Sequence, residues 1–370
     1  MLKTKQLLGK LLSDQIKQKS LKSPIKDVEF AVYSQFGEDG IIQFITHHLA
    51  DAIKNKIFIE IGVEDYTEAN TRFLLENNNW EGIIIDCCEK SINSIKASNF
   101  FWRNNLFAKK HYITKDNIHS VISELDVPDE IGLFSLDIDG NDYWVLKSLM
   151  ECNPKFEPAI IILEYNSFFG KELSVSIPYK ENFTWNTTYP PTYFGASLRA
   201  YYDLLKNHGY VLIGSTMAGN NAFFVHNNVN QGKLEALSVE QAYRRALFNL
   251  MPCYTKDKFV EQLKSLRYLQ VINLKDNQPL RLTGTELTSN TVLEEFNCIK
   301  DFLVYEDIQF LKNAYRYLLC REPDENEFQN FLPQLNQGVP REEILHAIRF
   351  SEEGNKINVI LLDLKEQMFV

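Results

Sequence analysis

The sequence lacks several features that would each place the protein in a recognisable class. It has no uninterrupted apolar run of about 18 residues, and its first ten residues mix lysines with leucines, so we expect no transmembrane helix and no cleaved signal. Its six cysteines form no CxxC pair and no zinc-site spacing, which predicts reduced structural thiols in the cytoplasm. A formal net charge of -10 argues against nucleic-acid binding and favours a small or neutral substrate.

An amphipathic helix is predicted within the N-terminal segment, residues 1–27. Its apolar residues recur at helical spacing and are Leu2, Leu7, Leu8, Leu11, Leu12 and Ile16. Lysines accompany them at positions 3, 5, 10, 17 and 19. We expect the apolar face to pack on its own domain or on a partner subunit. The alternative is peripheral contact of residues 1–20 with the anionic inner face of a membrane.

An α/β core is predicted over residues 28–228, where short apolar runs alternate with longer helical stretches. Such runs are typical of a parallel sheet with helices on both faces. The predicted strands are residues 57–61, 82–86, 131–137, 159–163, 210–213 and 222–225. A short glycine-containing link joins the last two, which should pair antiparallel. The expected fold class is therefore a Rossmann-like, doubly wound α/β sheet.

Two further parts follow from the remaining sequence pattern. Residues 171–194 form a long aromatic loop, which we expect to act as a lid or substrate wall through Trp185, Tyr189, Tyr193 and Phe194. Residues 229–300 are expected to be a helical connector, with helices at 239–250 and 256–266 and a polar junction at 282–291. Residues 301–370 then predict a small all-helical accessory domain.

The first predicted strand is followed by a candidate cofactor turn. Ligands of doubly wound sheets lie beyond the carboxyl ends of the strands, where Glu60 and Gly62 are placed. A glycine allows close backbone approach, and a carboxylate suits a cationic amino group. Asp86 ends the next strand, where an acid would bind the ribose hydroxyls of an adenosine. These acidic turns suit a sulfonium cofactor better than a pyrophosphate, which needs open backbone amides.

A second set of oxygen ligands follows two later strands, and consists of Asp137, Asp139, Glu164 and Asn166. Together they could bind Mg²⁺ or another divalent cation that orients a substrate hydroxyl. Alternatively, one of the carboxylates, Asp137, Asp139 or Glu164, could take the hydroxyl proton as a general base. The simplest interpretation of residues 139–142 is a turn and helix cap, since Asp, Asn and Gly favour such positions.

Eight ordered blocks between residues 33 and 228 resemble the FkbM-like methyltransferases of bacterial surface-polysaccharide loci. They are Ser34-Gln35-Phe36-Gly37-Glu38-Asp39, Asn70-Thr71-Arg72 with Leu74-Leu75-Glu76, Trp80 to Asp86, Leu136 to Trp144, Ile161 to Asn166, Ile177-Pro178-Tyr179, Tyr193 to Leu198, and Asn221 to Val225. Several ordered blocks are more specific than any one of them.

The resemblance implies S-adenosylmethionine as methyl donor and a hydroxyl of a sugar or glycan precursor as acceptor, in capsule or lipopolysaccharide biosynthesis. It implies cofactor contacts by Gln35, Glu60, Gly62, Asp65, Thr71, Asp86, Cys87 and Asp137. The acids after the two later strands are also similar to the metal-ligand pattern of catechol-type O-methyltransferases, with Glu164 in place of Asp and Tyr165 inserted. In the first motif of methyltransferases a second glycine usually follows Gly62 by two residues, and Glu64 stands at that position here.

The C-terminal part is similar to a helical domain of unknown function that is often attached to glycan enzymes. The likeness rests on residues 314–324 and 350–353, and Arg321 is expected to pair with Asp324 across a turn. This resemblance implies docking to glycan-assembly enzymes or to a glycan. A catalytically silent Rossmann-like scaffold that binds glycan or partner enzymes is the alternative to the methyltransferase hypothesis.

Overall fold

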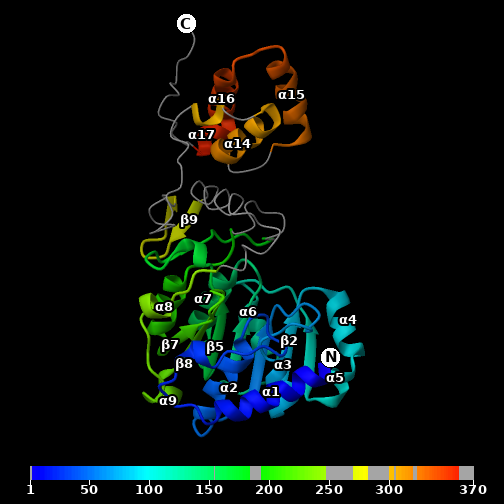
Figure 1. Ribbon diagram of the computed structural model, residues 1–370, viewed down its shortest axis with the longest axis vertical. Helices are drawn as coiled ribbons and strands as arrows, with labels where there is room; N and C mark the ends of the chain where they lie inside the picture. Colours follow the sequence, from blue (N-terminus) through cyan, green and yellow to red (C-terminus); the bar gives the residue numbers. More distant parts are fainter. Residues whose placement is uncertain are drawn as a thin grey trace. The chain divides into compact units, whose positions relative to one another are not determined.

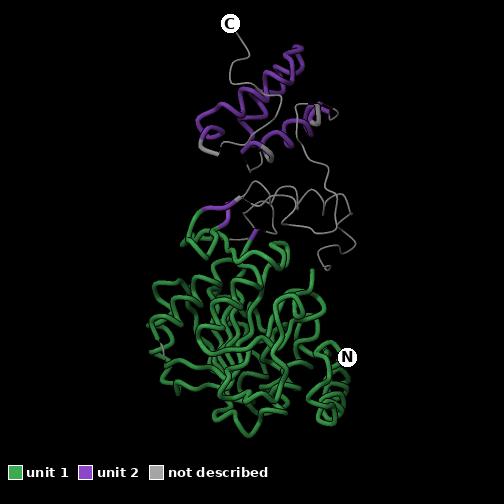
Figure 2. The backbone as a smooth tube through the Cα atoms, turned by 90° about the vertical axis from the view of Figure 1, so that its left-hand side faces the viewer, with its two compact units in different colours: residues 1–183, 194–249, 272–278 green, residues 184–193, 250–271, 279–370 purple. Residues whose placement is uncertain are grey.

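The computed structural model describes residues 2–153, 155–183, 193–246, 270–281, 300–303, 306–319 and 323–357. The chain forms two compact units (Figure 2). One contains residues 1–183, 194–249 and 272–278, and the other contains residues 184–193, 250–271 and 279–370. The first unit carries the sheet, and the second carries the C-terminal helices (Figure 1).

Seven strands form one sheet in the order β3-β2-β1-β4-β5-β8-β7 (Figure 1). They are β1 Ile57–Ile61, β2 Glu81–Asp86, β3 Leu106–Lys110, β4 Leu133–Leu136, β5 Ile160–Glu164, β7 Tyr210–Ser215 and β8 Asn221–His226. Strands β1 to β5 pair in parallel, whereas β8 runs antiparallel to both of its neighbours. The six predicted strands and the antiparallel pairing of the last two are confirmed. Because β4 lies beside β1 and not beside β3, the chain reverses direction across the sheet between β1 and β4.

Helices cover both faces of this sheet, so its central strands are buried on both sides. One face carries α2 Glu38–His48, α3 Arg72–Asn78 and α4 Glu89–Ala97, and the other carries α6 Ile118–Ser123, α7 Asp142–Cys152 and α8 Leu198–Asn207. Neighbouring side chains of a strand point to opposite faces. Accordingly Phe58 packs in the core under α2 and α3, and Ile59 packs in the core under α6 and α7. This arrangement confirms the predicted doubly wound α/β class.

The remaining elements before residue 282 are short. They are η1 Ile25–Asp27, α5 Asn99–Arg103, η2 Ser167–Phe169, β6 Val175–Ser176, α9 Asn227–Asn230, α10 Val239–Ala242, β9 Gln270–Asn273 and β10 Gln278–Arg281. Val175 of β6 pairs with Asn273 of β9 in an antiparallel register.

The connector expected to be helical over residues 229–300 differs from that prediction. It contains the strands β9 and β10, which the sequence pattern did not indicate. The helix predicted over 239–250 ends at Ala242, because Tyr243 takes an extended conformation and its hydroxyl donates to Ser167 O at 2.7 Å. The helix predicted at 256–266 and the junction at 282–291 lie outside the described residues.

Helix α1, Leu2–Ile16, forms where it was predicted but buries a different face from the one expected. Gly9, Ser13 and Ile16 are its buried residues. A Cβ on Gly9 would lie 2.4 Å from Val32 Cγ2, so the helix backbone packs directly on its neighbours. Ser13 Oγ donates to Gln43 Oε1 of α2 at 2.7 Å. Four leucines of α1 that were expected to pack are exposed, namely Leu7, Leu8, Leu11 and Leu12.

The second unit contains a helical module, as predicted for the C-terminal part. Its helices are α13 Lys300–Leu303, α14 Asp307–Leu319, α15 Glu325–Asn336, α16 Arg341–Arg349 and α17 Glu352–Ile357. Asp324 begins α15 with a capping box, since its carboxylate accepts from Glu327 N and the Glu327 carboxylate accepts from Asp324 N. The predicted partner of Asp324, Arg321, lies outside the described residues. No helix in the described part of the chain has the length and apolarity needed to cross a membrane.

Candidate functional site

The turn after β1 meets the end of β4 at the point where the sheet reverses. Gly62 has φ +82, and a Cβ built on it would lie 1.6 Å from Asp137 O. Backbone hydrogen bonds hold both sides of this contact, from Gly62 N to Ile85 O and from Asp137 N to Ile61 O. Glycine is therefore required at position 62 for the contact between two strand ends. From the sequence, Gly62 was expected to allow close approach of a cofactor.

Two further residues of this turn have left-handed backbone conformations that side chains seldom adopt. Glu64 has φ 46 and Tyr66 has φ 61. Tyr66 is fully buried, and its hydroxyl lies 2.8 Å from Thr71 Oγ1. Its carbonyl accepts from Arg72 Nη1 at 2.8 Å. Such strain persists only where the surroundings fix the backbone, and it is concentrated at functional sites.

Asp86 fixes the same turn from the end of β2. Its Oδ2 accepts from Val63 N at 3.1 Å and from Glu64 N at 2.8 Å, and its Oδ1 accepts from Cys88 N at 2.7 Å. The predicted ribose-binding acid therefore lies beside the predicted cofactor turn. It also satisfies three backbone donors that would otherwise lack partners.

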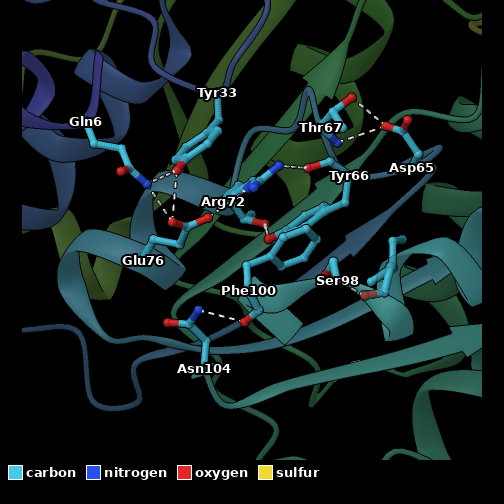
Figure 3. Close-up of polar contacts among 12 residues, drawn as sticks. Gln6, Tyr33, Asp65, Tyr66, Thr67, Arg72, Glu76, Ser98, Phe100 and Asn104 are labelled. Carbon is cyan, nitrogen blue, oxygen red and sulfur yellow. Dashed lines mark hydrogen bonds and ion pairs between the residues drawn. The ribbon is translucent and has the colours of Figure 1, made fainter. Parts of the chain in front are cut away.

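Arg72, which donates to the Tyr66 carbonyl, is a buried cation between two aromatic rings (Figure 3). Its guanidinium carbon lies 4.3 Å from the ring centroid of Tyr33 and 4.1 Å from that of Phe100. Arg72 Nε donates to Glu76 Oε1 at 2.9 Å, and Tyr33 OH donates to Glu76 Oε2 at 2.9 Å. Burial raises the pKa of Tyr33 to about 12, so its hydroxyl stays a donor. The network joins α3 to the chain that precedes α2.

Glu60 of β1 is buried and holds the start of α3. Its carboxylate accepts from Asn70 N at 2.9 Å, from Thr71 N at 3.1 Å and from the Thr71 hydroxyl. Burial raises the pKa of Glu60 to about 7, against the opposing effect of these donors. Two residues predicted to contact the cofactor, Glu60 and Thr71, are thus brought together behind the turn.

A buried carboxylate outside the predicted set, that of Asp39, lies in the first turn of α2. Asp39 Oδ2 accepts from the backbone amides of Val32, Tyr33 and Ser34. Its other oxygen, Oδ1, is buried and has no hydrogen-bond partner among the described residues. Burial raises the pKa of Asp39 to about 6. An unpaired buried acceptor of this kind is suited to a donor supplied by a ligand.

A similar unpaired acceptor lies at the start of β8. Asn221 pairs in register with Glu164 of β5, and its Nδ2 donates to Glu38 Oε1 at 2.9 Å. Asn221 Oδ1 is buried and lacks a hydrogen-bond partner within the part of the chain that the structure describes. Because β8 is reversed, its first residue lies at the same sheet edge as the carboxyl ends of the parallel strands.

Three predicted carboxylates meet at the ends of β4 and β5. Asp137, Asp139 and Glu164 each place an oxygen within 4.8 Å of the others. Burial, together with the charge of Asp139, raises the pKa of Asp137 well above its usual range. Burial and the charge of Asp137 do the same for Glu164, and burial and Asp142 raise the pKa of Asp139 to about 6. A bound cation would offset this repulsion and favour the ionised forms of the three carboxyls.

Asp142 and Asn166, which lie next to the three carboxylates in the sequence, have structural partners. Asp142 accepts from Ile138 N at 2.7 Å and from Gly140 N at 2.8 Å, which confirms a turn and helix start for this residue. Asn166 Oδ1 accepts from Phe168 N at 3.0 Å, and Asn166 Nδ2 donates to Phe194 O at 2.9 Å. The amide of Asn166 therefore holds the chain after β5, and its role as a metal ligand stays a prediction.

Residues 177–183, part of the predicted aromatic wall, are held against the β4–α7 turn. Three side chains donate to their backbone carbonyls, each at 2.8 Å, namely Asn141 to Lys180 O, Trp144 to Ile177 O and Tyr112 to Glu181 O. Phe183 lies against Gly140, where an added Cβ would be 2.4 Å from its Cδ1. Trp185 and Tyr189 lie outside the described residues, and Tyr193 and Phe194 are half-buried.

The outer members of the predicted cofactor set lie at the surface. Gln35, Asp65 and Cys87 are exposed. The Asp65 carboxylate accepts from Thr67 N at 2.9 Å (Figure 3), and hydrogen bonds from Thr67 lower the pKa of Asp65. Burial raises the pKa of the Cys87 thiol. These three residues remain predicted contacts.

The strand order and the single reversed strand define a Rossmann-like, doubly wound α/β sheet, and acids lie at its β1–β4 switch point. Solved structures with a similar course include a SAM-dependent methyltransferase from Aquifex aeolicus, at 11% identity and a TM-score of 0.32, covering 57% of this chain and 96% of that chain. Another is the O-methyltransferase from Bacillus cereus in complex with SAH, at 14% identity and a TM-score of 0.32, covering 60% of this chain and 98% of that one.

The accessory module has a separate match. Residues 300–358 match the family described as Domain of unknown function (DUF4214). This agrees with the predicted helical domain of unknown function. No curated protein sequence matches the chain.

Proposed function

We propose that this protein is an S-adenosylmethionine-dependent O-methyltransferase that acts on a hydroxyl of a sugar or glycan precursor. The observation that carries the proposal is the set of carboxylates around the switch point between β1 and β4. Doubly wound sheets bind their ligands at that point, and the acidic surroundings suit a sulfonium. The resemblance to FkbM-like proteins supports the acceptor class.

The residues present fit this cofactor. Asp86 holds the turn in which Val63 and Glu64 lie, and an adenosine would lie beside it. The unpaired oxygens of Asp39 and Asn221 offer acceptors for a cationic amino group at the same sheet edge. S-adenosylmethionine would supply the methyl group as an electrophile.

The carboxylate cluster would prepare the acceptor. Asp139 is the exposed member of the cluster, and its pKa of about 6 leaves it ionised at neutral pH. It would take the proton of the acceptor hydroxyl as the oxygen bonds to the methyl carbon. Asp137, Asp139 and Glu164 would together supply oxygen ligands to a divalent cation, whose charge would favour the ionised forms of Asp137 and Glu164.

Binding of the cofactor is the first test. S-adenosylmethionine and S-adenosylhomocysteine should each raise the melting temperature, because a ligand that binds only the folded state stabilises it by about 2.7 kcal/mol at 100 times its Kd. Asp86→Asn should remove most of the shift, since an amide nitrogen would replace one of its acceptor oxygens. Asp116→Asn, at an exposed ion pair with Lys115, is the matched control. No shift with either ligand at millimolar concentration would contradict the proposal.

Binding should also depend on pH in a way that separates the two ligands. As the pH rises through about 6, Asp139 becomes ionised and attracts the sulfonium of S-adenosylmethionine, a charge that S-adenosylhomocysteine lacks. We expect the affinity ratio to move about five-fold toward S-adenosylmethionine between acid and neutral pH, as one screened charge pair supplies about 1 kcal/mol. Calorimetric titration at several pH values measures this ratio. Asp139→Asn should flatten it, and a ratio that falls with pH would oppose the role of the cluster.

One observation favours the alternative of a catalytically silent scaffold. Glu60, Asp86 and Asn166 already bind backbone groups, so the fold alone uses part of the predicted site. Such a scaffold would bind glycan or glycan-assembly enzymes through the aromatic wall and the helical module. Glycan binding in the absence of any cofactor-induced shift would support this alternative.

A further inference from the structure

Helix α1 has its polar and small side chains turned inward and its leucines turned outward. The side chains facing the domain are Gln6, Gly9, Ser13 and Ile16, which recur every three or four residues along one face. Leu7, Leu8, Leu11 and Leu12 are 64%, 54%, 62% and 39% exposed. A helix on a globular domain normally buries its apolar stripe.

Specific contacts fix this orientation, so the leucines cannot simply rotate into the core. Gln6 Nε2 donates to Glu76 Oε2 at 2.9 Å and to the Tyr33 hydroxyl (Figure 3). Gly9 allows the helix backbone to approach Val32 and Phe73 at a distance that a larger residue would prevent. Rotation of α1 would break both contacts and the hydrogen bond between Ser13 and Gln43.

The exposed leucines lie between basic flanks. Lys3, Lys10 and Lys17 are spaced seven residues apart along one side of the leucines, and Lys5 lies on the other side. Through residue 26 the chain has lysines at positions 3, 5, 10, 17, 19, 22 and 26 against a single acid, Asp14, in a protein whose net charge is -10. The basic charge is therefore concentrated where the leucines are exposed.

We propose that the outer face of α1, formed by Leu7, Leu8, Leu11, Leu12 and the flanking lysines, binds the surface of an anionic lipid bilayer. The leucines would enter the boundary between headgroups and acyl chains, while the long lysine side chains keep their charges at the level of the lipid phosphates. The helix would lie in the plane of the interface, as its length and its lysines require.

A second copy of the chain fits this face less well. In a two-fold contact through the leucines, like surfaces meet. Because both flanks carry lysine, either relative direction of the two helices would set lysines against lysines. An anionic bilayer instead neutralises both flanks at once, so charge complementarity favours the lipid surface.

Sedimentation with vesicles tests the proposal on the full chain. Binding to vesicles with about 30% phosphatidylglycerol in phosphatidylcholine should exceed binding to pure phosphatidylcholine by at least about ten-fold, since each lysine near an anionic surface contributes about five-fold. Leu8→Glu with Leu11→Glu should reduce binding to the anionic vesicles by at least about ten-fold, because each leucine buries apolar surface. Lys3→Gln with Lys10→Gln should weaken that binding and reduce its dependence on salt.

A matched control and a measure of folding make the outcomes decisive. Ile308→Glu changes an exposed apolar residue of the helical module, 57% exposed, and should leave vesicle binding unchanged. The α1 variants should keep the melting temperature of the wild type, because the exposed leucines contribute little packing. Equal binding to both kinds of vesicle, or binding to neither, would overturn the proposal. A dimer that dissociates in the leucine variant, without vesicle binding, would overturn it in favour of a second copy.

Discussion

Gly62→Ala is expected to destabilise the protein by more than about 3 kcal/mol and to abolish cofactor binding. The added Cβ would lie 1.6 Å from Asp137 O, so the turn after β1 and the end of β4 must separate. The backbone at φ +82 adds a conformational cost, because L side chains are disfavoured there. Urea denaturation followed by circular dichroism measures the loss of stability, and thermal shifts with S-adenosylhomocysteine measure binding.

Gly232→Ala provides the matched control for Gly62→Ala. Gly232 has φ +75, and a Cβ on it would have no atom within 4 Å. Only the conformational cost of about 1 kcal/mol should be seen there. The difference between the two variants isolates the contact between the strand ends. Similar losses at both positions would show that the contact with Asp137 does not constrain the turn.

Arg72→Ala is the second substitution with a large expected effect, a loss of about 3–5 kcal/mol, as found when one partner of a buried ion pair is removed. The variant leaves the Glu76 carboxylate without its cation. The Glu76 side chain is only 19% exposed. It also removes a donor to Tyr66 O and the packing between the rings of Tyr33 and Phe100. Chemical denaturation gives the free energy of unfolding.

Two further variants test the cause of that loss. Arg103→Ala removes an arginine whose guanidinium carbon lies 4.8 Å from the ring centroid of the exposed Trp102, and should cost less than about 1 kcal/mol. Glu76→Gln added to Arg72→Ala should recover about 1–2 kcal/mol, because it removes the uncompensated charge. If the double variant is no more stable than Arg72→Ala, the ion pair is not the main source of the effect.

The sheet could be predicted from the sequence because its buried strands form short apolar runs. Strand β3 was missed, since it lies at the edge of the sheet and its second residue, Phe107, is 54% exposed. Periodicity likewise located α1 but indicated the wrong buried face. Hydrophobicity cannot show that Gly9 and Ser13 pack, because their contribution is close approach and hydrogen bonding.

The candidate site was predictable where chain order alone places residues at strand ends. Asp86, Asp137 and Glu164 follow from the rule that ligands lie beyond the carboxyl ends of parallel strands. Asp39 and Asn221 could not be found in this way, because their position depends on tertiary contacts such as the hydrogen bond between Glu38 and Asn221, 183 residues apart. Asp39 and Asn221 each belong to a block of the FkbM-like resemblance, and that resemblance was the signal in the sequence that could have indicated them.

The way residues 177–183 are held bears on how this protein could change its substrate. The anchoring side chains, Asn141, Trp144 and Tyr112, lie outside this segment in the first unit, and all three donate to its backbone carbonyls. Nearly every amino acid offers the same carbonyl, so residues 180 and 181 are free to vary without loss of these anchors, whereas Ile177 is fully buried. New acceptor preferences could therefore evolve in this segment while the turn at Gly62 and the carboxylate cluster stay as they are.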